Sequence, residues 1–124
     1  MVLDTSAILA LVGAEPGGDR VAEVIEGSVI SAPNWTEFLG VMARRGVDVA
    51  DASAYLRALG PRIVDCDVND AEHAARIGAS RPALSLGDRL CLGAAASMGS
   101  KVLTADRIWS ELGLEGEVEI EVIR

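Results

Sequence analysis

Four acidic residues stand where an apolar run gives way to a helix-like pattern: Asp4, Glu37, Asp88 and Asp106. In a parallel α/β sheet the carboxyl ends of the strands lie along one edge, and ligands bind in the crevice where the strand order reverses. Four carboxylates gathered there would repel one another unless a cation were present, and Mg²⁺ or Mn²⁺ binds carboxylate and water oxygens readily. We therefore expect one shared carboxylate pocket that holds a divalent metal ion.

Each of these acids also has a purely structural interpretation. Asp4 and Asp106 are suited to cap the helices that follow them. Glu37 and Asp88 are suited to be the return acids of capping boxes that begin three residues earlier. The two interpretations stay open for each acid taken singly.

A further capping pattern shows how little such a motif proves alone. Residues 69–72 form the same box after a strand that we place at the sheet edge, away from the site. What favours a site is the combination, because Asp4 and Asp106 would end neighbouring central strands. Glu37 and Asp88 would begin helices packed beside those strands.

The rest of the chain predicts the elements that position the acids. Apolar runs bounded by turn residues predict strands at residues 2–3, 28–32, 62–68, 101–104 and 118–122. Helical spacing and capping signals predict helices at 6–12, 16–26, 38–45, 49–59, 69–78, 85–99 and 108–112. The order is strand-helix-helix three times and then strand-helix-strand. It favours an α/β fold with a parallel sheet and helices on both faces.

Length and composition limit the possibilities further. A chain of 124 residues and 12.9 kDa suits one domain spanning residues 1–124. Half of the residues are hydrophobic but only 3% are aromatic, so aliphatic side chains must build the core, and the apolar surplus suggests a partner interface. A net charge of -8 argues against non-specific binding of nucleic acids, which relies on Lys and Arg. Metal in the pocket would reduce the repulsion that a phosphate meets.

The two cysteines and the N-terminal segment carry no functional signal. Cys66 and Cys91 lack the spacing of a disulfide framework or a thiolate zinc site, and we expect two buried thiols. No charged signal-like segment opens the sequence, and no apolar run reaches the roughly 18 residues that cross a bilayer. We therefore expect a soluble, cytoplasmic protein.

Four segments taken in order resemble the PIN-domain nucleases. They are Val-Leu-Asp-Thr-Ser-Ala at 2–7, Trp-Thr-Glu-Phe-Leu at 35–39, Leu-Ser-Leu-Gly-Asp at 84–88 and Val-Leu-Thr-Ala-Asp-Arg at 102–107. The likeness spans essentially the whole chain. Its compact length and short loops resemble the toxin ribonucleases of bacterial VapBC toxin-antitoxin modules. The resemblance implies a single PIN-like domain with a five-stranded parallel sheet in the order 3-2-1-4-5.

The resemblance also implies a chemistry. Asp4, Glu37, Asp88 and Asp106 would bind Mg²⁺ or Mn²⁺ and hydrolyse RNA to 5′-phosphate and 3′-hydroxyl ends, with the number of metal ions open. Ser6 and Thr104 would support them by orienting a carboxylate or a metal-bound water, with local capping as the alternative for Ser6. The expected partners are an RNA substrate, a second copy in a homodimer, and an antitoxin whose basic, apolar tail covers the acidic pocket.

Two features depart from the pattern of that family. Gly87 stands before Asp88 where alanine is more usual, and no further acid follows Asp106. We expect a modest metal affinity as a result. Arg89 and Arg107, each beside a candidate ligand, are the nearest candidate phosphate contacts, with ion pairing to the acids as the alternative.

Other functions fit parts of the sequence. A PIN ribonuclease that matures RNA without being a toxin is not distinguishable from a toxin here. A receiver-type phosphoacceptor or a haloacid-dehalogenase-like phosphatase would also place acids at strand ends and would be phosphorylated on Asp4. However, Thr5 and Ser6 stand where these classes expect a second acid, and Lys101, the only lysine, stands at the start of the fourth strand instead of following the last one.

Overall fold

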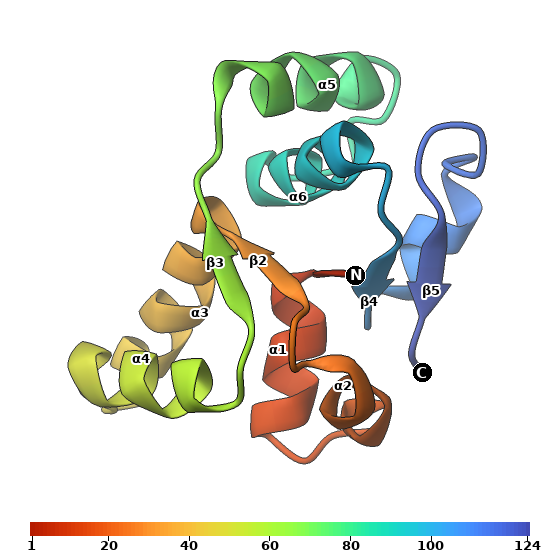
Figure 1. Cartoon of the computed structure of the whole chain (residues 1–124). Coiled ribbons are helices and arrows are strands. Elements are labelled where there is room, and N and C mark those ends of the chain that lie inside the picture. The colour runs from red at the N-terminus through yellow and green to blue at the C-terminus, as the bar shows by residue number, and fades with distance from the viewer.

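Five parallel strands form the central sheet of the computed structural model, which describes residues 1–124 (Figure 1). They are β1 (Val2–Leu3), β2 (Val29–Ser31), β3 (Arg62–Val64), β4 (Val102–Thr104) and β5 (Ile120–Val122). Their order is β3-β2-β1-β4-β5, and every neighbouring pair is parallel. This arrangement confirms the predicted sheet and places β1 and β4 side by side at its centre.

Helices supply the crossovers that parallel strands require. They are α1 (Thr5–Val12), α2 (Gly18–Val24), α3 (Ala32–Arg44), α4 (Val49–Ala58), α5 (Val68–Gly78) and α6 (Leu86–Met98), with a short 3-10 helix, η1 (Arg107–Glu111). Both faces of the sheet are covered, with α5 and α6 on one side and α1 and α2 on the other (Figure 1). The predicted layers are confirmed.

Alternation along the strands divides the core into two clusters, because successive side chains of a strand point to opposite faces. Val2, Val29 and Val102 pack in the cluster of α5 and α6, whereas Leu3, Ile30 and Leu103 pack in the cluster of α1 to α4. Most of the buried side chains are aliphatic; Phe38 and Trp109 are the largest exceptions. The composition predicted such a core.

Helix α3 begins earlier than the sequence predicted. The capping box predicted for Glu37 begins three residues earlier and so makes Asn34 the N-cap, but Ser31 holds that position and Pro33 lies in the first turn. Proline is compatible with a first turn because the N–H that it lacks would have no partner within the helix there. Asn34 is buried inside the turn, and Glu37 lies one turn further on. The capping-box interpretation of Glu37 is therefore wrong.

Helix α5 also begins earlier, and β3 ends sooner, at Val64. The capping box consists of Asp67 and Asp70 instead of residues 69 and 72. Asp67 accepts from the Asp70 backbone N–H at 2.9 Å, and Asp70 accepts from that of Asp67 at 3.1 Å. The predicted box at 69–72 is wrong, whereas the edge position of β3 is confirmed.

Both cysteines are free thiols. Cys91 is buried, but Cys66 is only half-buried, so the prediction of two buried thiols holds for Cys91 alone. None of the helices has the length and hydrophobicity needed to cross a bilayer.

Candidate active site

The sheet order brings two of the predicted acids to the same edge. Asp4 directly follows β1 and Asp106 follows β4, and these strands pair with Leu3 opposite Leu103. Glu37 lies in the second turn of α3, and Asp88 lies in the first turn of α6. The acids therefore come from two strand ends and two helix starts.

Asp4 is the buried member of the group, with 4% of its surface exposed. Its Oδ2 accepts hydrogen bonds from the Ser6 hydroxyl and from Thr104 Oγ1, the latter at 2.9 Å. The pKa of Asp4 is raised to about 6, chiefly by burial; the hydrogen bonds from Ser6 and Thr104 oppose this rise, and the nearby Asp88 charge adds to it. Asp4 is thus a poorly solvated carboxylate that is still mostly ionised at neutral pH.

The same two hydroxyls link Asp4 to the segment that carries Asp106. Ser6 Oγ accepts from the Ala105 backbone N–H at 2.9 Å, and Thr104 Oγ1 accepts from that of Asp106 at 3.1 Å. The two hydroxyl oxygens are 3.1 Å apart. Ser6 and Thr104 therefore hold the ends of β1 and β4 together, in addition to orienting Asp4.

Glu37 is held by residues that the sequence analysis missed. Its Oε1 accepts from Thr5 Oγ1 at 2.8 Å and from Asn34 Nδ2 at 3.0 Å. Ser31 Oγ donates to Asn34 Oδ1 at 2.7 Å, and both Ser31 and Asn34 are fully buried. The spacing of three residues between Asn34 and Glu37 predicts a side-chain contact within one helix, but only if α3 is known to begin before Asn34.

The structural roles predicted for the other acids are present as well. Asp88 and Ser85 form the predicted capping box, in which Asp88 Oδ2 accepts from the Ser85 backbone N–H at 2.9 Å. Asp106 caps η1 by accepting from the Ile108 backbone N–H at 3.1 Å, and Asp4 caps α1. Capping occupies only one oxygen of each carboxylate.

A common pattern follows for all four acids. One oxygen of each is bonded within the protein, whereas the other has no hydrogen-bond partner: Asp4 Oδ1, Glu37 Oε2, Asp88 Oδ1 and Asp106 Oδ2. None of the four forms a salt bridge. The site thus contains four carboxylates without a protein cation, each with an oxygen available to a ligand.

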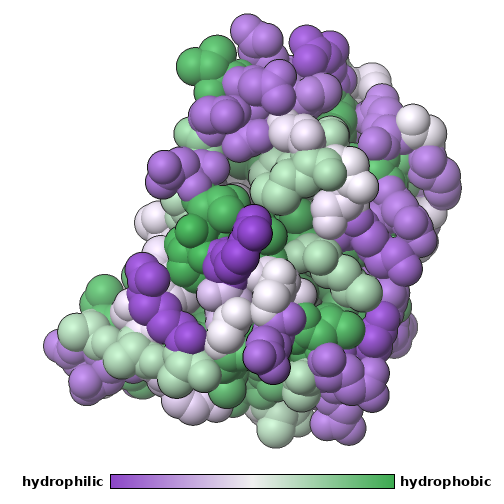
Figure 2. Space-filling model, viewed as in Figure 1, coloured by the Kyte–Doolittle hydropathy of each residue, from purple (hydrophilic) through white to green (hydrophobic).

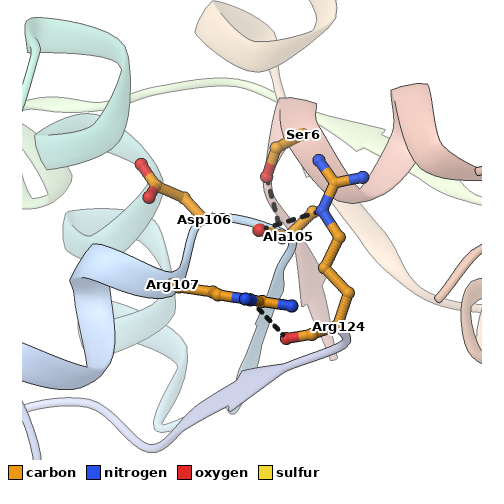
Figure 3. A pocket seen from close by; sticks show the side chains of 5 residues that line it. All are labelled: Ser6, Ala105, Asp106, Arg107 and Arg124. Carbon is orange, nitrogen blue, oxygen red and sulfur yellow. Dashed lines mark hydrogen bonds between the residues drawn. The ribbon is translucent and has the colours of Figure 1, made fainter. Parts of the chain in front are cut away.

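The side chains do not form a closed metal site in this geometry. No three of the His, Cys, Asp and Glu side chains lie close enough together to hold a metal ion. Burial raises the pKa of Cys91 well above its ordinary value, and the charges of Asp4, Asp88 and Glu37 add to that effect. The carboxylate of Asp106 is turned away from Ser6 (Figure 3). Oxygen donors of this kind suit Mg²⁺ or Mn²⁺, but joining them requires side-chain rotation.

A pocket of about 500 Å³ opens beside Asp106 (Figure 3). It is lined by Ser6, Ala105, Asp106, Arg107 and Arg124. Arg107 Nε donates to the Arg124 carbonyl at 3.2 Å, and Arg124 pairs with Glu15 at 3.0 Å. Pairing of Arg107 with the acids, the alternative considered from the sequence, is therefore wrong. Arg124 was missed because nothing in its local sequence marks it.

Arg89 also forms no salt bridge, and its Nε donates to the Ser85 carbonyl at 3.3 Å. The methylene stem lies against Gly78, where an added Cβ would meet Arg89 Cδ. Pairing of Arg89 with the acids is wrong too. A role in phosphate binding stays a prediction for both arginines.

Acids at the ends of β1 and β4 and at the starts of α3 and α6 also describe a known family. Residues 1–114 match the PIN domain. The chain belongs to the PIN domain family. Ribonuclease VapC42 of Mycobacterium tuberculosis is 33% identical over 117 residues, which cover 83% of this chain and 88% of that protein. The likeness extends over most of both chains.

Solved structures share the fold. A toxin-antitoxin complex from Klebsiella pneumoniae contains a chain with a TM-score of 0.79 and 16% identity, covering 99% of this chain and 97% of that one. VapC20 of Mycobacterium tuberculosis, a toxin that cleaves the sarcin-ricin loop, gives a TM-score of 0.70 at 17% identity over 90% of this chain and 94% of its own. At these identities the likeness establishes the PIN fold alone.

Proposed function

We propose that this PIN-domain protein is a metal-dependent endoribonuclease and the toxin of a toxin-antitoxin module. It would hydrolyse RNA phosphodiester bonds to 5′-phosphate and 3′-hydroxyl ends. The observation that carries the proposal is the set of four carboxylates, each with one anchored and one free oxygen and none paired with a cation. The similarity to VapC42, a ribonuclease, supports the same conclusion.

Asp4, Glu37, Asp88 and Asp106 are the residues that would hold Mg²⁺ or Mn²⁺. A bound ion of this kind lowers the pKa of a coordinated water and neutralises charge at the leaving oxygen. Asp4 supplies a fixed donor because Ser6 and Thr104 both bind its Oδ2 and leave Oδ1 free. Glu37, Asp88 and Asp106 are more accessible than Asp4, so a ligand can reach their free oxygens.

The pocket beside Asp106 offers a place for the RNA backbone. Arg107 and Arg124 bring two guanidinium groups to its wall, in a chain whose net charge is -8. Only the Nε atom of Arg107 is used in a hydrogen bond, so its terminal nitrogens are available to a phosphate. We assign phosphate binding to Arg107 and Arg124, and to Arg89, which follows Asp88 in α6.

Partner binding follows from the same proposal. The protein would act on RNA in the cytoplasm as a homodimer and be silenced by a cognate antitoxin whose basic tail covers the acids. Apolar surface is available, since the exposed Val47 and Tyr55 line an apolar pocket of about 350 Å³ and Val49 is exposed as well. Figure 2 shows hydrophobic residues exposed near the middle of one face and hydrophilic residues along its top and right edges. Such exposure is typical of interfaces.

Cleavage of total cellular RNA by purified, antitoxin-free protein tests the proposal. Wild type should give discrete fragments with Mg²⁺ or Mn²⁺ and none with EDTA. Asp88→Asn should cleave at least about 100-fold more slowly while staying folded, because asparagine retains an oxygen for the Ser85 N–H but loses the charge. Undiminished cleavage by the variant would contradict the assignment.

Expression in cells separates a toxin from a ribonuclease of RNA maturation. A toxin should arrest growth, the Asp88→Asn variant should not, and co-expression of a small DNA-binding protein from a neighbouring gene should restore growth. An active enzyme that leaves growth unchanged would favour the maturation role.

A further inference from the structure

Gly87 lies at a position where the backbone does not require glycine. It is the second residue of α6, and it is not among the glycines with positive φ. Glycine is a poor helix former compared with alanine, so its presence in the first turn weakens the helix. A reason for glycine must therefore come from what lies against its Cα atom.

The carboxylate of Glu37 occupies the space that a side chain at position 87 would fill. An added Cβ would lie 2.6 Å from Glu37 Oε2 and 2.7 Å from both Oε1 and Cδ. All three atoms are at the end of a flexible side chain. Alanine at this position would therefore displace the carboxylate without forcing the helix backbone to move.

Gly87 is distinctive among the glycines of the chain. At Gly18 and Gly93 the nearest obstacle to a Cβ is the backbone of another helix or turn, which is a packing constraint. Gly40, also helical, has only Arg44 near it, at 3.5 Å. At no other position would a Cβ come within 3 Å of a carboxylate.

Glu37 cannot avoid Gly87 without losing its own hydrogen bonds. Thr5 and Asn34 hold Oε1 from the side of α1 and α3, and Asn34 is itself fixed by buried Ser31. The carboxylate is thus confined between this hydrogen-bond network and the first turn of α6. The positive end of the α6 dipole favours a negative group at that position.

We propose that Gly87 is a positioning residue, whose missing side chain lets the Glu37 carboxylate lie over the first turn of α6, next to Asp88. Asp88 is the adjacent residue in that turn, so the contact sets the approach of these two acids. The inference rests on the proposed nuclease function and extends it to a residue that is not one of the four acids. The sequence alone associated this glycine with a modest metal affinity; the contact with Glu37 assigns it the opposite effect, because a Cβ would displace the carboxylate.

The test compares Gly87→Ala with a matched control, Gly40→Ala, and with Glu37→Gln. In EDTA, Gly87→Ala should melt at or above the temperature of wild type, because alanine favours the helix. Its Mn²⁺ affinity, measured by titration calorimetry, should fall about 10-fold or more, and its kcat should fall by a similar factor with little change in KM. Gly40→Ala should match wild type in affinity and kcat.

The double variant Gly87→Ala/Glu37→Gln provides the decisive comparison. If Gly87 acts only through Glu37, adding Gly87→Ala to Glu37→Gln should change affinity and kcat by less than about twofold. Losses that multiply, or a Gly87→Ala protein with wild-type Mn²⁺ affinity and kcat, would overturn the inference.

Melting in EDTA separates this inference from the proposed function. Gly87→Ala should raise the melting temperature more in a Glu37→Ala background than in wild type, because the Glu37 carboxylate no longer crowds the new Cβ there. Equal shifts would overturn the contact itself. A wild-type protein that neither binds Mn²⁺ nor cleaves RNA would instead contradict the proposed function, even where the melting temperatures show the coupling.

Discussion

Replacing Asp4 with asparagine should stabilise the metal-free protein while abolishing its activity. The variant keeps an oxygen that can accept from Ser6 and Thr104 and can still cap α1, so the hydrogen-bonded framework survives. What it removes is a negative charge on a side chain that is almost fully buried. A protein that becomes more stable when a buried charged side chain is neutralised keeps that side chain for a function, such as ligand binding, at a cost in folding stability.

The size of the gain follows from the pKa of Asp4, which burial raises from 3.8 to about 6. Each pH unit of this difference corresponds to about 1.4 kcal/mol, so the ionised carboxylate costs the fold about 3 kcal/mol at pH 7.5. The folded state keeps a proton that the unfolded state has lost, so wild type loses stability as pH rises from about 4 to about 6. The asparagine variant does not undergo this loss.

Urea denaturation in EDTA at pH 4 and pH 7.5 measures the effect. Asp4→Asn should exceed wild type by up to about 3 kcal/mol at pH 7.5, equivalent to about 10 °C in melting temperature, and by far less at pH 4. The exposed Asp51→Asn variant should stay within about 0.5 kcal/mol of wild type. If Asp4→Asn were no more stable than wild type at pH 7.5, Asp4 would not be the poorly solvated carboxylate described above.

Two further predictions follow. A Mn²⁺ concentration of about 100 times the dissociation constant at pH 7.5 should stabilise wild type by about 2.7 kcal/mol at that pH. The same concentration should stabilise it by much less at pH 5, where Asp4 holds a proton, and a gain independent of pH would count against Asp4 as a ligand. Gly93→Ala should lower the free energy of unfolding by about 1–3 kcal/mol, because its Cβ would lie 2.3 Å from the Asp70 carbonyl oxygen, whereas Gly116→Ala, with open space around it, should be neutral in the same denaturation assay.

Much of the fold was predictable because its signals are local. Short apolar runs between turn residues mark every strand, and alternation within them sorts side chains such as Val2 and Leu3 to opposite faces. The order of the strands was different: it came from the family resemblance, since no local pattern states which strands pair. The start of a helix was predicted correctly where a single residue could cap it, as at Ser85 before α6. It was predicted wrongly where several residues could do so, as at α3 and α5.

The start of α3 shows where local signals fail. Ser31 and Asn34 are both good N-cap residues, and Pro33 between them suits either a loop or a first turn. The choice is made by tertiary contacts, because Asn34 points inward to bind Thr5 and Glu37. Sequence reasoning about a single helix contains no such information.

The candidate site was predictable in its acids and not in what surrounds them. Asp4 and Asp106 could be located because they end strands, and Asp88 because it starts a helix. The contacts of Glu37 with Thr5 and Gly87 join separate elements, as does the position of Arg124 beside Asp106. These contacts depend on packing that spans most of the chain.

The chemistry of the RNA ends tests the central claim most directly. Fragments produced by wild type in Mn²⁺ should carry 5′-phosphate and 3′-hydroxyl ends, because a metal-activated water is the attacking group. Asp88→Asn and EDTA should each abolish these fragments. Fragments with 5′-hydroxyl and cyclic phosphate ends, formed equally well in EDTA, would show attack by the RNA's own hydroxyl. That result would contradict a metal-dependent site at Asp4, Glu37, Asp88 and Asp106.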